Sequence, residues 1–369
     1  MTLIIPTLFG IEGIVSQELK RLGAADIVTH DGKVEFTGDY RDIAKVNLWI
    51  RSGERVLIKL GEFKALTFDE LFEGVKALEV ENYIGKNDEF PVKGYSLKSK
   101  LFSVPDCQSI IKKALVNRLS EKYHISWFEE TGPKKQIQFS IFNDIVTVML
   151  DTTGPGLHKR GYRAVSNEAP LRETLAAAII SLTHFRAGDF LYDPFCGSGT
   201  ISIEAAMYAA NIAPGLKRRF AGENFPEIDK KIWLDERLAA RDLIRKSDNH
   251  IFSSDIDPSA IKLTLENAKK AGVEEYITAE TVDVKDFKLK ENKYSVVVCN
   301  PPYGERLMEQ RAAEDMYKEM GGIFKDLPQT KFYILTSHED FESLYGKKAD
   351  KNRKLYNGMI KCYLFQYFK

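Results

Sequence analysis

Asp193-Pro194-Phe195-Cys196-Gly197-Ser198-Gly199-Thr200 lies between a predicted strand, 190–193, and a predicted helix, 201–210. Gly197 and Gly199 allow the backbone to turn tightly and to approach a ligand closely. Open α/β sheets bind ligands at the carboxyl ends of their strands, which is the position of this loop. A dinucleotide-binding loop would have a third glycine where Ser202 stands, and the Gly-Lys-Ser/Thr of a Walker loop is missing. The segment therefore predicts a ligand loop of another kind in an α/β sheet.

Beyond this loop, strand-like runs alternate with longer helical segments, which is typical of a parallel sheet. The last two runs flank Asn357-Gly358, which predicts an antiparallel hairpin at the edge of that sheet. A parallel sheet closed by such a hairpin is the Rossmann-like arrangement of a class I methyltransferase, and we expect it in residues 170–369. The further strands expected are 251–255, 277–282, 294–300 and 332–336, followed by the hairpin that ends with 361–368.

Polar side chains stand at the ends of two of these strands. Asp255 ends the second strand, where it could accept hydrogen bonds from ribose hydroxyls, and Ile256 could cover an adenine face. Asp283 ends the third strand, where it could bind an adenine amino group or cap the next helix. Asp257 precedes Pro258, and for this residue we favour the role of a helix cap.

Asn300-Pro301-Pro302-Tyr303 ends the fourth strand. Proline has no backbone N–H, so this segment offers an amide side chain and a carbonyl without a competing donor. Two such acceptors can hold both hydrogens of an exocyclic NH2 group, and Tyr303 offers a ring on which a flat substrate can stack. The four residues are therefore our catalytic candidates, with an ordinary turn as the alternative.

Two smaller α/β units precede the sheet. Residues 1–60 follow the order strand, helix, strand, strand, helix, strand, with Asp31-Gly32 in a tight turn, and this order is ferredoxin-like. Residues 61–151 form a second α+β unit, and residues 152–169 are rich in turn formers and cations, as expected for a basic linker. The elements expected in the second unit are helices 68–77 and 108–123 and strands 136–142 and 146–150.

The 369 residues carry no formal net charge, so contacts with nucleic acid must come from local patches. No run approaches the ~18 apolar residues of a membrane span. The four cysteines lack metal-ligand spacing, so we expect no metal and a reducing cytoplasmic location. The candidate nucleic-acid contacts are Lys98, Lys100, Lys112, Lys113, His158, Lys159, Arg160 and Arg163.

Four segments of the chain together resemble one enzyme family: D-P-F-C-G-S-G-T, S-D-I-D, N-P-P-Y-G-E-R and, upstream, G-L-H-K-R-G-Y-R. They are similar to the THUMP-domain RNA guanine-N2-methyltransferases, in particular the RlmL/YpsC-like branch that acts on large-subunit (23S) rRNA. The resemblance covers essentially the whole chain. It implies a ferredoxin-like part, a THUMP RNA-binding domain and a class I domain that binds S-adenosylmethionine (SAM).

The resemblance also implies roles for particular residues. Residues 197–200 would cradle the methionine end of SAM, Asp255 would hold its ribose, and Asp283 would bind its adenine. Asn300 with Pro301 would hold the target amine. The full set expected to bind the cofactor is Asp193, Pro194, Cys196, Gly197, Ser198, Gly199, Thr200, Asp255, Ile256, Asp283, Val284 and Asn300.

Other functions remain open at this stage. A planar amine also occurs in adenine N6 and in the glutamine side chain, although an RNA-binding N-terminal part disfavours glutamine. Transfer RNA could replace ribosomal RNA as the substrate. A noncatalytic RNA-binding factor in ribosome assembly could keep the same fold, although the intact glycine loop and Asn300 argue against it.

Overall fold

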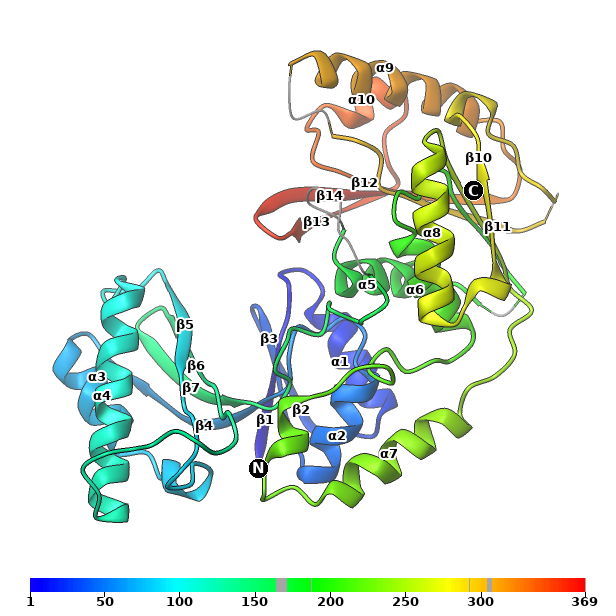
Figure 1. The fold of residues 1–369 in the computed structure, drawn as a ribbon. Coiled ribbons are helices and arrows are strands. Elements are labelled where there is room, and N and C mark those ends of the chain that lie inside the picture. The colour runs from blue at the N-terminus through cyan, green and yellow to red at the C-terminus, as the bar shows by residue number, and fades with distance from the viewer. Residues whose placement is uncertain (164–170, 187, 292, 304–306, 369) are drawn as a thin grey trace.

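The computed structural model describes residues 1–163, 171–186, 188–291, 293–303 and 307–368. These residues form two seven-stranded sheets, one before and one after residue 160. Figure 1 shows the N-terminal sheet with its helices below and beside the C-terminal sheet. Residues 304–306 of N-P-P-Y-G-E-R, and residues 164–169 of the expected linker, lie outside the described residues.

The two N-terminal units share one continuous sheet, with strand order β2-β3-β1-β4-β7-β6-β5. Strand β4 joins them, because it pairs with β1 on one side and with β7 on the other. The elements of the first unit are β1 (Thr2–Pro6), α1 (Glu12–Arg21), β2 (Ala25–His30), β3 (Lys33–Thr37), α2 (Tyr40–Trp49) and β4 (Leu57–Lys64).

The second unit adds the three remaining strands of this sheet. Strand β5 was not predicted, because it is a half-exposed edge strand in which glycine and lysine interrupt the apolar pattern. The elements of this unit are α3 (Phe68–Lys76), η1 (Val80–Asn82), β5 (Val92–Leu97), α4 (Val104–Tyr123), β6 (Ile137–Phe142) and β7 (Ile145–Asp151).

Strands alternate their side chains between the two faces of this sheet. On one face, Phe36, Phe139 and Val148 belong to a core that also includes residues of α2, α3 and α4. The opposite face carries polar and half-exposed residues such as Glu35 and Tyr95, around a small buried cluster of Ile4, Leu57 and Met149. The N-terminal sheet is thus packed against helices on one face and open on the other.

The C-terminal sheet has the predicted class I methyltransferase arrangement. Its order is β10-β9-β8-β11-β12-β14-β13, in which β8 to β12 are parallel and β14 runs antiparallel to both of its neighbours, β12 and β13. The predicted α/β fold class with its C-terminal hairpin is confirmed. The strands are β8 (Phe190–Asp193), β9 (His250–Asp255), β10 (Ile277–Thr281), β11 (Ser295–Cys299), β12 (Thr330–Thr336), β13 (Lys351–Asn357) and β14 (Ile360–Tyr367).

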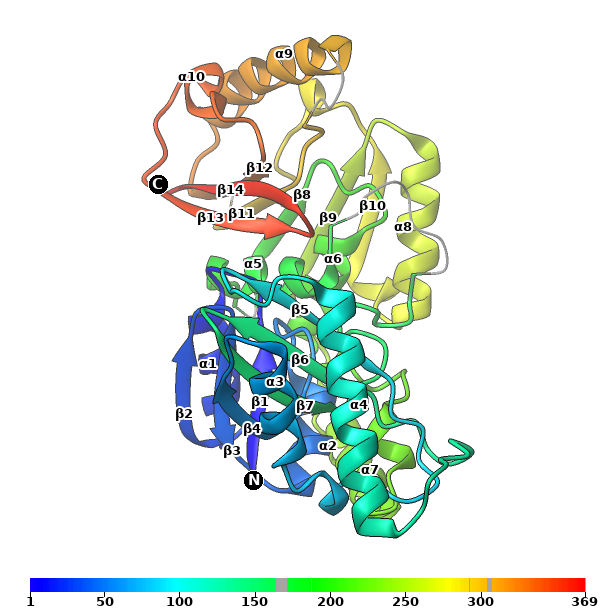
Figure 2. The same ribbon diagram turned by 90° about the vertical axis from the view of Figure 1, so that its left-hand side faces the viewer.

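Helices cover both faces of this sheet, as parallel strands require. One face packs against α5, α6 and α8, and the other against α9 and α10, as Figure 2 shows from the side. The helices and short turns are α5 (Glu173–Thr183), α6 (Thr200–Ala209), η2 (Ala221–Asn224), α7 (Lys230–Asp242), α8 (Pro258–Ala271), η3 (Glu274–Tyr276), η4 (Val284–Asp286), α9 (Leu307–Phe324) and α10 (Phe341–Tyr345).

The two halves of the chain share their cores. The segment between α6 and β9 packs on the N-terminal unit, where the rings of Phe220 and Trp233 stack with centroids 5.4 Å apart and join that unit's core. In return, Ile11 and Ile14 at the start of α1 join the core of the C-terminal sheet. The N-terminal unit therefore supports the fold of the part that carries the predicted cofactor residues.

The expected basic linker needs a correction. In its described part, Thr152, Thr153 and Tyr162 are buried. Asn47 of α2 donates a hydrogen bond to Thr152 (3.0 Å) and accepts one from Thr153 (2.7 Å). Residues 152–163 therefore form a packed seam between the two halves of the chain. The hydroxyl groups of Thr152 and Thr153 give the buried Asn47 amide the hydrogen-bond partners that it needs.

Candidate functional site

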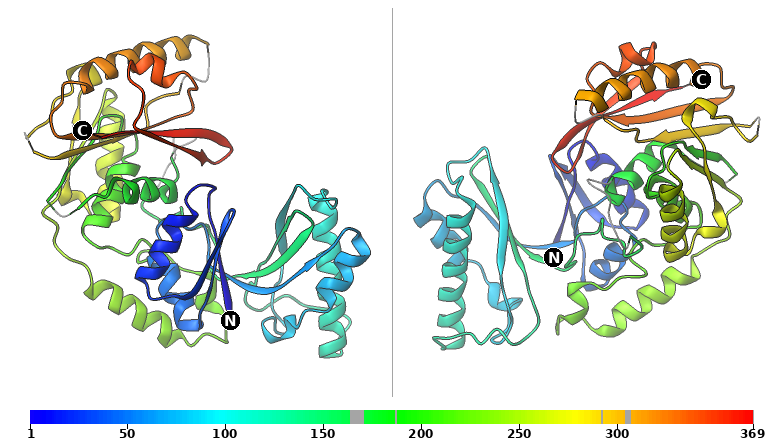
Figure 3. Two further views of the ribbon diagram at one scale, coloured as in Figure 1. Left: turned by 180° about the vertical axis from the view of Figure 1, so that it is seen from behind. Right: turned by 45° about the horizontal axis from the view of Figure 1, so that its top comes forward.

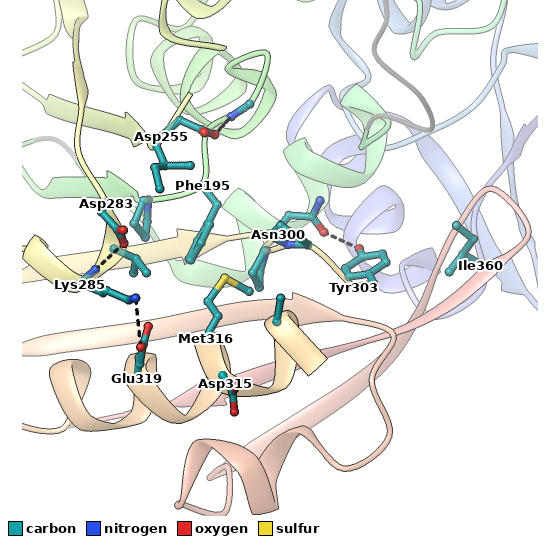
Figure 4. A pocket seen from close by; sticks show the side chains of 17 residues that line it. Phe195, Asp255, Asp283, Lys285, Asn300, Tyr303, Asp315, Met316, Glu319 and Ile360 are labelled. Carbon is teal, nitrogen blue, oxygen red and sulfur yellow. Dashed lines mark hydrogen bonds and ion pairs between the residues drawn. The ribbon is translucent and has the colours of Figure 1, made fainter. Parts of the chain in front are cut away.

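A cavity of about 720 Å³ opens at the carboxyl ends of β8, β9, β10 and β11, where the glycine loop was predicted to lie. Figure 4 shows side chains from these strand ends and from α9 converging on it. The lining residues are Pro194, Phe195, Gly197, Asp255, Ile256, Asp283, Val284, Lys285, Asn300, Pro301, Pro302, Tyr303, Ala312, Asp315, Met316, Glu319 and Ile360.

The glycine loop is held in place by hydrogen bonds between its backbone and side chains of β9 and α8. Gly197 donates its N–H to Asp255 Oδ2 at 2.9 Å, and its carbonyl accepts a hydrogen bond from Thr264 of α8, also at 2.9 Å. Gly197 has φ of +52° and nothing within 4 Å of the place where a Cβ would stand, so the loop presents bare backbone to the cavity. Gly199 has φ of +80°, and a Cβ there would lie 2.8 Å from a Thr264 methyl. Both conformations favour glycine.

The strand-end acids occupy the predicted positions. Asp255 lines the cavity, and its second oxygen accepts the N–H of Asp257 at 3.0 Å. Asp257 caps α8 as predicted, accepting the N–H of Ser259 at 2.8 Å. Asp283 caps the short turn η4 through the N–H of Lys285 (3.0 Å) and lines the cavity as well. The Asp283 side chain therefore caps η4 and lines the cavity at the same time.

Asn300 and Tyr303 contact each other at one end of the cavity. The Tyr303 hydroxyl donates a hydrogen bond to Asn300 Oδ1, and Figure 4 shows the two side chains facing each other. Burial raises the pKa of Tyr303, so the phenol stays protonated and remains a donor. Tyr317 of α9 donates to the carbonyl of Pro302 at 2.9 Å, which fixes the turn that follows β11.

Sequence reasoning missed seven of the residues that line this cavity. Phe195 lies inside the quoted loop and Lys285 follows Asp283 and Val284, so a wider window around each motif would have included them. No local pattern marks the others, because α9 and the hairpin reach the cavity only through the tertiary fold. Lys285 forms an ion pair with Glu319 of α9 at 3.4 Å. The lining residues from α9 and the hairpin are Ala312, Asp315, Met316, Glu319 and Ile360.

Several predicted cofactor residues lie beneath the cavity instead of lining it. Asp193 is buried, and one of its oxygens accepts the N–H of Phe195 at 3.3 Å, so it shapes the start of the loop. Burial raises the pKa of the Cys196 and Cys299 thiols, which leaves both as neutral, small buried residues. The predicted residues absent from the cavity wall are Asp193, Cys196, Ser198, Gly199 and Thr200.

Some of the residues predicted to contact nucleic acid are exposed, and others, called engaged here, form ion pairs or hydrogen bonds within the protein. Arg160 is 3% exposed, lies 3.3 Å from Glu204 and donates to the Arg51 carbonyl at 2.5 Å. It therefore cannot reach a phosphate, and its prediction is corrected. Arg163 hydrogen-bonds to Thr200 at the start of α6. The other engaged residues are His158, 3.5 Å from Glu54, and Lys112, which pairs with Glu130; the exposed ones are Lys98, Lys100, Lys113 and Lys159.

The cavity suits a ligand that carries positive charge and a ribose. Among the described lining residues, four carboxylates (Asp255, Asp283, Asp315 and Glu319) face one ammonium group, that of Lys285. SAM has a positively charged sulfonium and amino group, an adenine and two ribose hydroxyls. The open backbone at Gly197, the strand-end carboxylates and the apolar side chains of Phe195 and Met316 fit these groups. No cluster of His, Cys, Asp or Glu that could hold a metal occurs in the described part of the chain.

A parallel sheet with a reversed C-terminal hairpin, a glycine loop and strand-end acids around one cavity defines a class I methyltransferase domain. Family comparisons match residues 160–366 to "RMKL-like, methyltransferase domain", residues 2–57 to "RlmL ferredoxin-like domain" and residues 65–151 to "THUMP domain". The chain belongs to this RMKL-like methyltransferase family, which confirms the resemblance seen in the sequence, and its cofactor is SAM.

Individual relatives match along the whole chain. YpsC of Bacillus subtilis (strain 168) is 46% identical over 371 residues, covering 100% of this chain and 96% of that protein. The ribosomal RNA large subunit methyltransferase K/L of Psychromonas ingrahamii is 34% identical over 98% of this chain, which spans 49% of that longer protein. The crystal structure of SMU.472 complexed with SAH is 42% identical, with a TM-score of 0.91, covering 100% of this chain and 97% of that one.

Replacing Asp255 with alanine should weaken SAM binding by about 1–3 kcal/mol, the range for leaving a polar partner unsatisfied. Isothermal titration of the full chain with SAM and with its demethylated product would measure this. Asp257→Ala is the matched control, because Asp257 caps α8 without lining the cavity. That control should cost about 1 kcal/mol of stability and leave SAM affinity unchanged. Undiminished binding by Asp255→Ala would remove Asp255 from the cofactor site.

Proposed function

We propose that this chain transfers a methyl group from SAM to the exocyclic 2-amino group of a guanine in large-subunit (23S) rRNA. The coarser statement, a SAM-dependent RNA methyltransferase, rests on membership of the family and on its THUMP domain. The large-subunit rRNA substrate is supported by the name of the K/L relative, a ribosomal RNA large subunit methyltransferase. The guanine 2-amino target rests on the acceptors of Asn300 and Pro301 and on the resemblance described above. The proposal places the chain in the cytoplasm, although the structure itself adds only that no described helix is long and apolar enough to cross a membrane.

One observation carries the chemistry of the proposal. Asn300 and Pro301 line the same cavity as Gly197 and Asp255, so an amine held by the first pair would lie beside a cofactor held by the second. Bound SAM supplies an electrophilic methyl group on its sulfonium. Positioning two reactants in one cavity in this way is worth several kcal/mol of the barrier.

The acceptors would also activate the amine. The lone pair of the guanine 2-amino group is delocalised into the ring, so the group is a poor nucleophile. Acceptors on both N–H bonds favour the tetrahedral form and stabilise the positive charge that develops during methyl transfer. The Tyr303 hydroxyl already donates to Asn300 Oδ1. A carbonyl oxygen has two lone pairs, so it can accept a hydrogen bond from the substrate at the same time.

The base must leave its stack before its amine can enter the cavity, which costs a few kcal/mol when it is paired. The wall of the cavity offers Phe195, Pro302 and Tyr303 as surfaces for a flat ring. The substrate is therefore expected to be RNA that is free of ribosomal proteins at this position, since an assembled subunit would rarely expose the base.

Nuclease digestion and mass spectrometry of RNA from a strain that lacks the gene would test the proposal. We expect loss of one N2-methylguanine from 23S rRNA, restored by the wild-type gene and not by an Asn300→Ala copy. Loss of the methyl group from transfer RNA would show that transfer RNA is the substrate instead of 23S rRNA. Loss of N6-methyladenine would show that the target base is adenine instead of guanine. Unchanged RNA in all fractions would favour a noncatalytic role in ribosome assembly.

A further inference from the structure

A second concavity, of about 1060 Å³, lies between the open face of the N-terminal sheet and the tip of the β13–β14 hairpin. Figure 3 shows the hairpin tip projecting toward that sheet. We call this concavity the sheet–hairpin groove. It is lined by Pro6, Thr7, Leu8, Phe9, His30, Asp31, Gly32, Lys33, Glu35, Lys59, Glu62, Tyr95, Ser96, Leu97, Ser140, Phe142, Asn143, Ile145, Thr147, Tyr356, Gly358 and Met359.

The β13–β14 hairpin contributes to both the groove and the candidate cavity. Gly358 and Met359 form the tip of the hairpin and line the groove, whereas Ile360, the next residue, lines the cavity. Figure 4 shows Ile360 on the hairpin on the same side of the cavity as Tyr303. A chain that leaves the cavity past Tyr303 would therefore cross the hairpin tip and enter the groove.

Aromatic side chains stand exposed along this groove. Tyr95 on β5 is 56% exposed and Phe9 is 46% exposed. Phe142 and Tyr356 are half-buried on opposite walls, one on the sheet and one on the hairpin. Exposed rings of this kind are what unpaired bases stack on, and such stacking tolerates any base because every base has a flat face.

The charges differ between the floor of the groove and its edges. On the floor, Lys33 and Lys59 lie 2.7 Å and 3.1 Å from Glu35, and both also pair with Glu62. Asp31 adds a third carboxylate to the lining, so the floor itself does not attract phosphates. At the edges, Lys98 lies 5.9 Å from the Phe142 ring and Lys354 lies 5.5 Å from the Tyr356 ring. Both are exposed, and neither forms an ion pair with any acidic residue in the described part of the chain. Two exposed cations at the edges and the exposed rings of Tyr95 and Phe9 within the groove match a single strand, with phosphates on the lysines and bases on the rings.

We propose that the sheet–hairpin groove binds the single-stranded RNA that flanks the target base. This inference rests on the proposed function and deepens it, because it makes unpaired RNA the substrate class. It also moves the expected RNA surface. Of the eight residues predicted from the sequence, Lys98 lies at the groove, whereas Arg160 is buried in the seam between the two halves.

Fluorescence anisotropy of the full chain with a labelled single-stranded RNA of about 12 nucleotides would test the groove, since single-strand grooves bind roughly 4–16 nucleotides. Tyr95→Ala should weaken binding about 5- to 150-fold, which is the stacking contribution of one base. Trp127→Ala is the matched control, because Trp127 is 80% exposed and lies outside the groove. It should leave the affinity unchanged.

Charge reversal gives an independent test that does not depend on the aromatic residue. Lys98→Glu should reduce the slope of log affinity against log salt by about 0.7, the value for one lost phosphate contact. Lys86→Glu, an exposed lysine outside the groove, should not change it. A duplex of the same composition should bind more weakly than the single strand.

The proposed RNA-binding role of the groove would be wrong if the groove variants and their controls lost RNA affinity equally. It would also be wrong if the duplex bound as tightly as the single strand. Failure of the wild-type chain to bind the single strand would also overturn it and would favour a protein partner for this face. These outcomes are separate from the proposed function, which is judged by methyl transfer to RNA from the deletion strain. Normal methylation by Tyr95→Ala and Lys98→Glu, with normal binding, would reject the groove and keep the function.

Discussion

Asn300→Ala should lower the single-turnover rate of methyl transfer at least about a hundredfold, as expected for one lost transition-state hydrogen bond. SAM affinity should stay nearly unchanged, because the loop at Gly197 and the carboxylates of Asp255 and Asp283 remain in place. Rapid mixing of the enzyme–SAM complex with RNA from the deletion strain, followed by quantification of the methylated base, would measure the rate. Calorimetry on the same variant would measure the SAM affinity.

Tyr303 provides the controls for this experiment. Tyr303→Phe keeps the ring and removes the hydroxyl group that donates to Asn300 Oδ1. It should reduce the rate less than Asn300→Ala does, because the amide oxygen remains. Tyr303→Ala should weaken RNA binding by about 1–3 kcal/mol if the ring stacks on the target base. Near wild-type single-turnover kinetics in Asn300→Ala would exclude the amine-holding role.

Arg160→Ala should lower the free energy of unfolding by about 3–5 kcal/mol, the usual cost of breaking a buried ion pair. The reason lies in the seam between the two halves of the chain. Arg160 lies 3.3 Å from Glu204 on α6, and it donates to the carbonyls of Leu157 (2.9 Å) and Arg51 (2.5 Å). Its removal leaves the Glu204 carboxylate buried without its cation. Denaturant titration monitored by tryptophan fluorescence would measure the loss.

Lys159→Ala is the matched control, since Lys159 is the exposed neighbour of Arg160. It should leave stability unchanged within about 0.5 kcal/mol, as is usual for surface substitutions. The same pair of variants separates structure from RNA binding at this segment. An Arg160→Ala variant of normal stability and reduced RNA affinity would contradict the structural role and restore the role inferred from the sequence.

The candidate site was predictable to the extent that it is built from strand ends. The glycine loop, Asp255, Asp283 and Asn300 each follow an apolar run, and the carboxyl ends of parallel strands meet at one edge of a sheet. Local order along the chain therefore implied spatial proximity at the cavity. The same reasoning could not reach Met316 or Glu319, because nothing in an amphipathic helix indicates which neighbour its faces will meet.

The basic residues show the limit more plainly. Lys98, Lys159 and Arg160 look alike in sequence, as cations in turn-rich segments. In the structure Lys98 and Lys159 are exposed, whereas Arg160 is buried and pairs with Glu204. Glu204 lies on α6, 44 residues away along the chain, so no local pattern reveals this pairing. Whether a cation is free or paired depends on such distant partners.

The sequence by itself determined the class I methyltransferase domain, the ferredoxin-like order and the motifs of the cavity, because these depend on local periodicity and on turn chemistry. The tertiary structure alone decided that β4 joins two units into one sheet and that Phe220 and Trp233 complete the N-terminal core. It also decided that the hairpin tip faces an open sheet to form a groove. The physical reason is that strand pairing between units, core packing and burial of charge are contacts between segments distant in sequence, and no local pattern records which segments will meet.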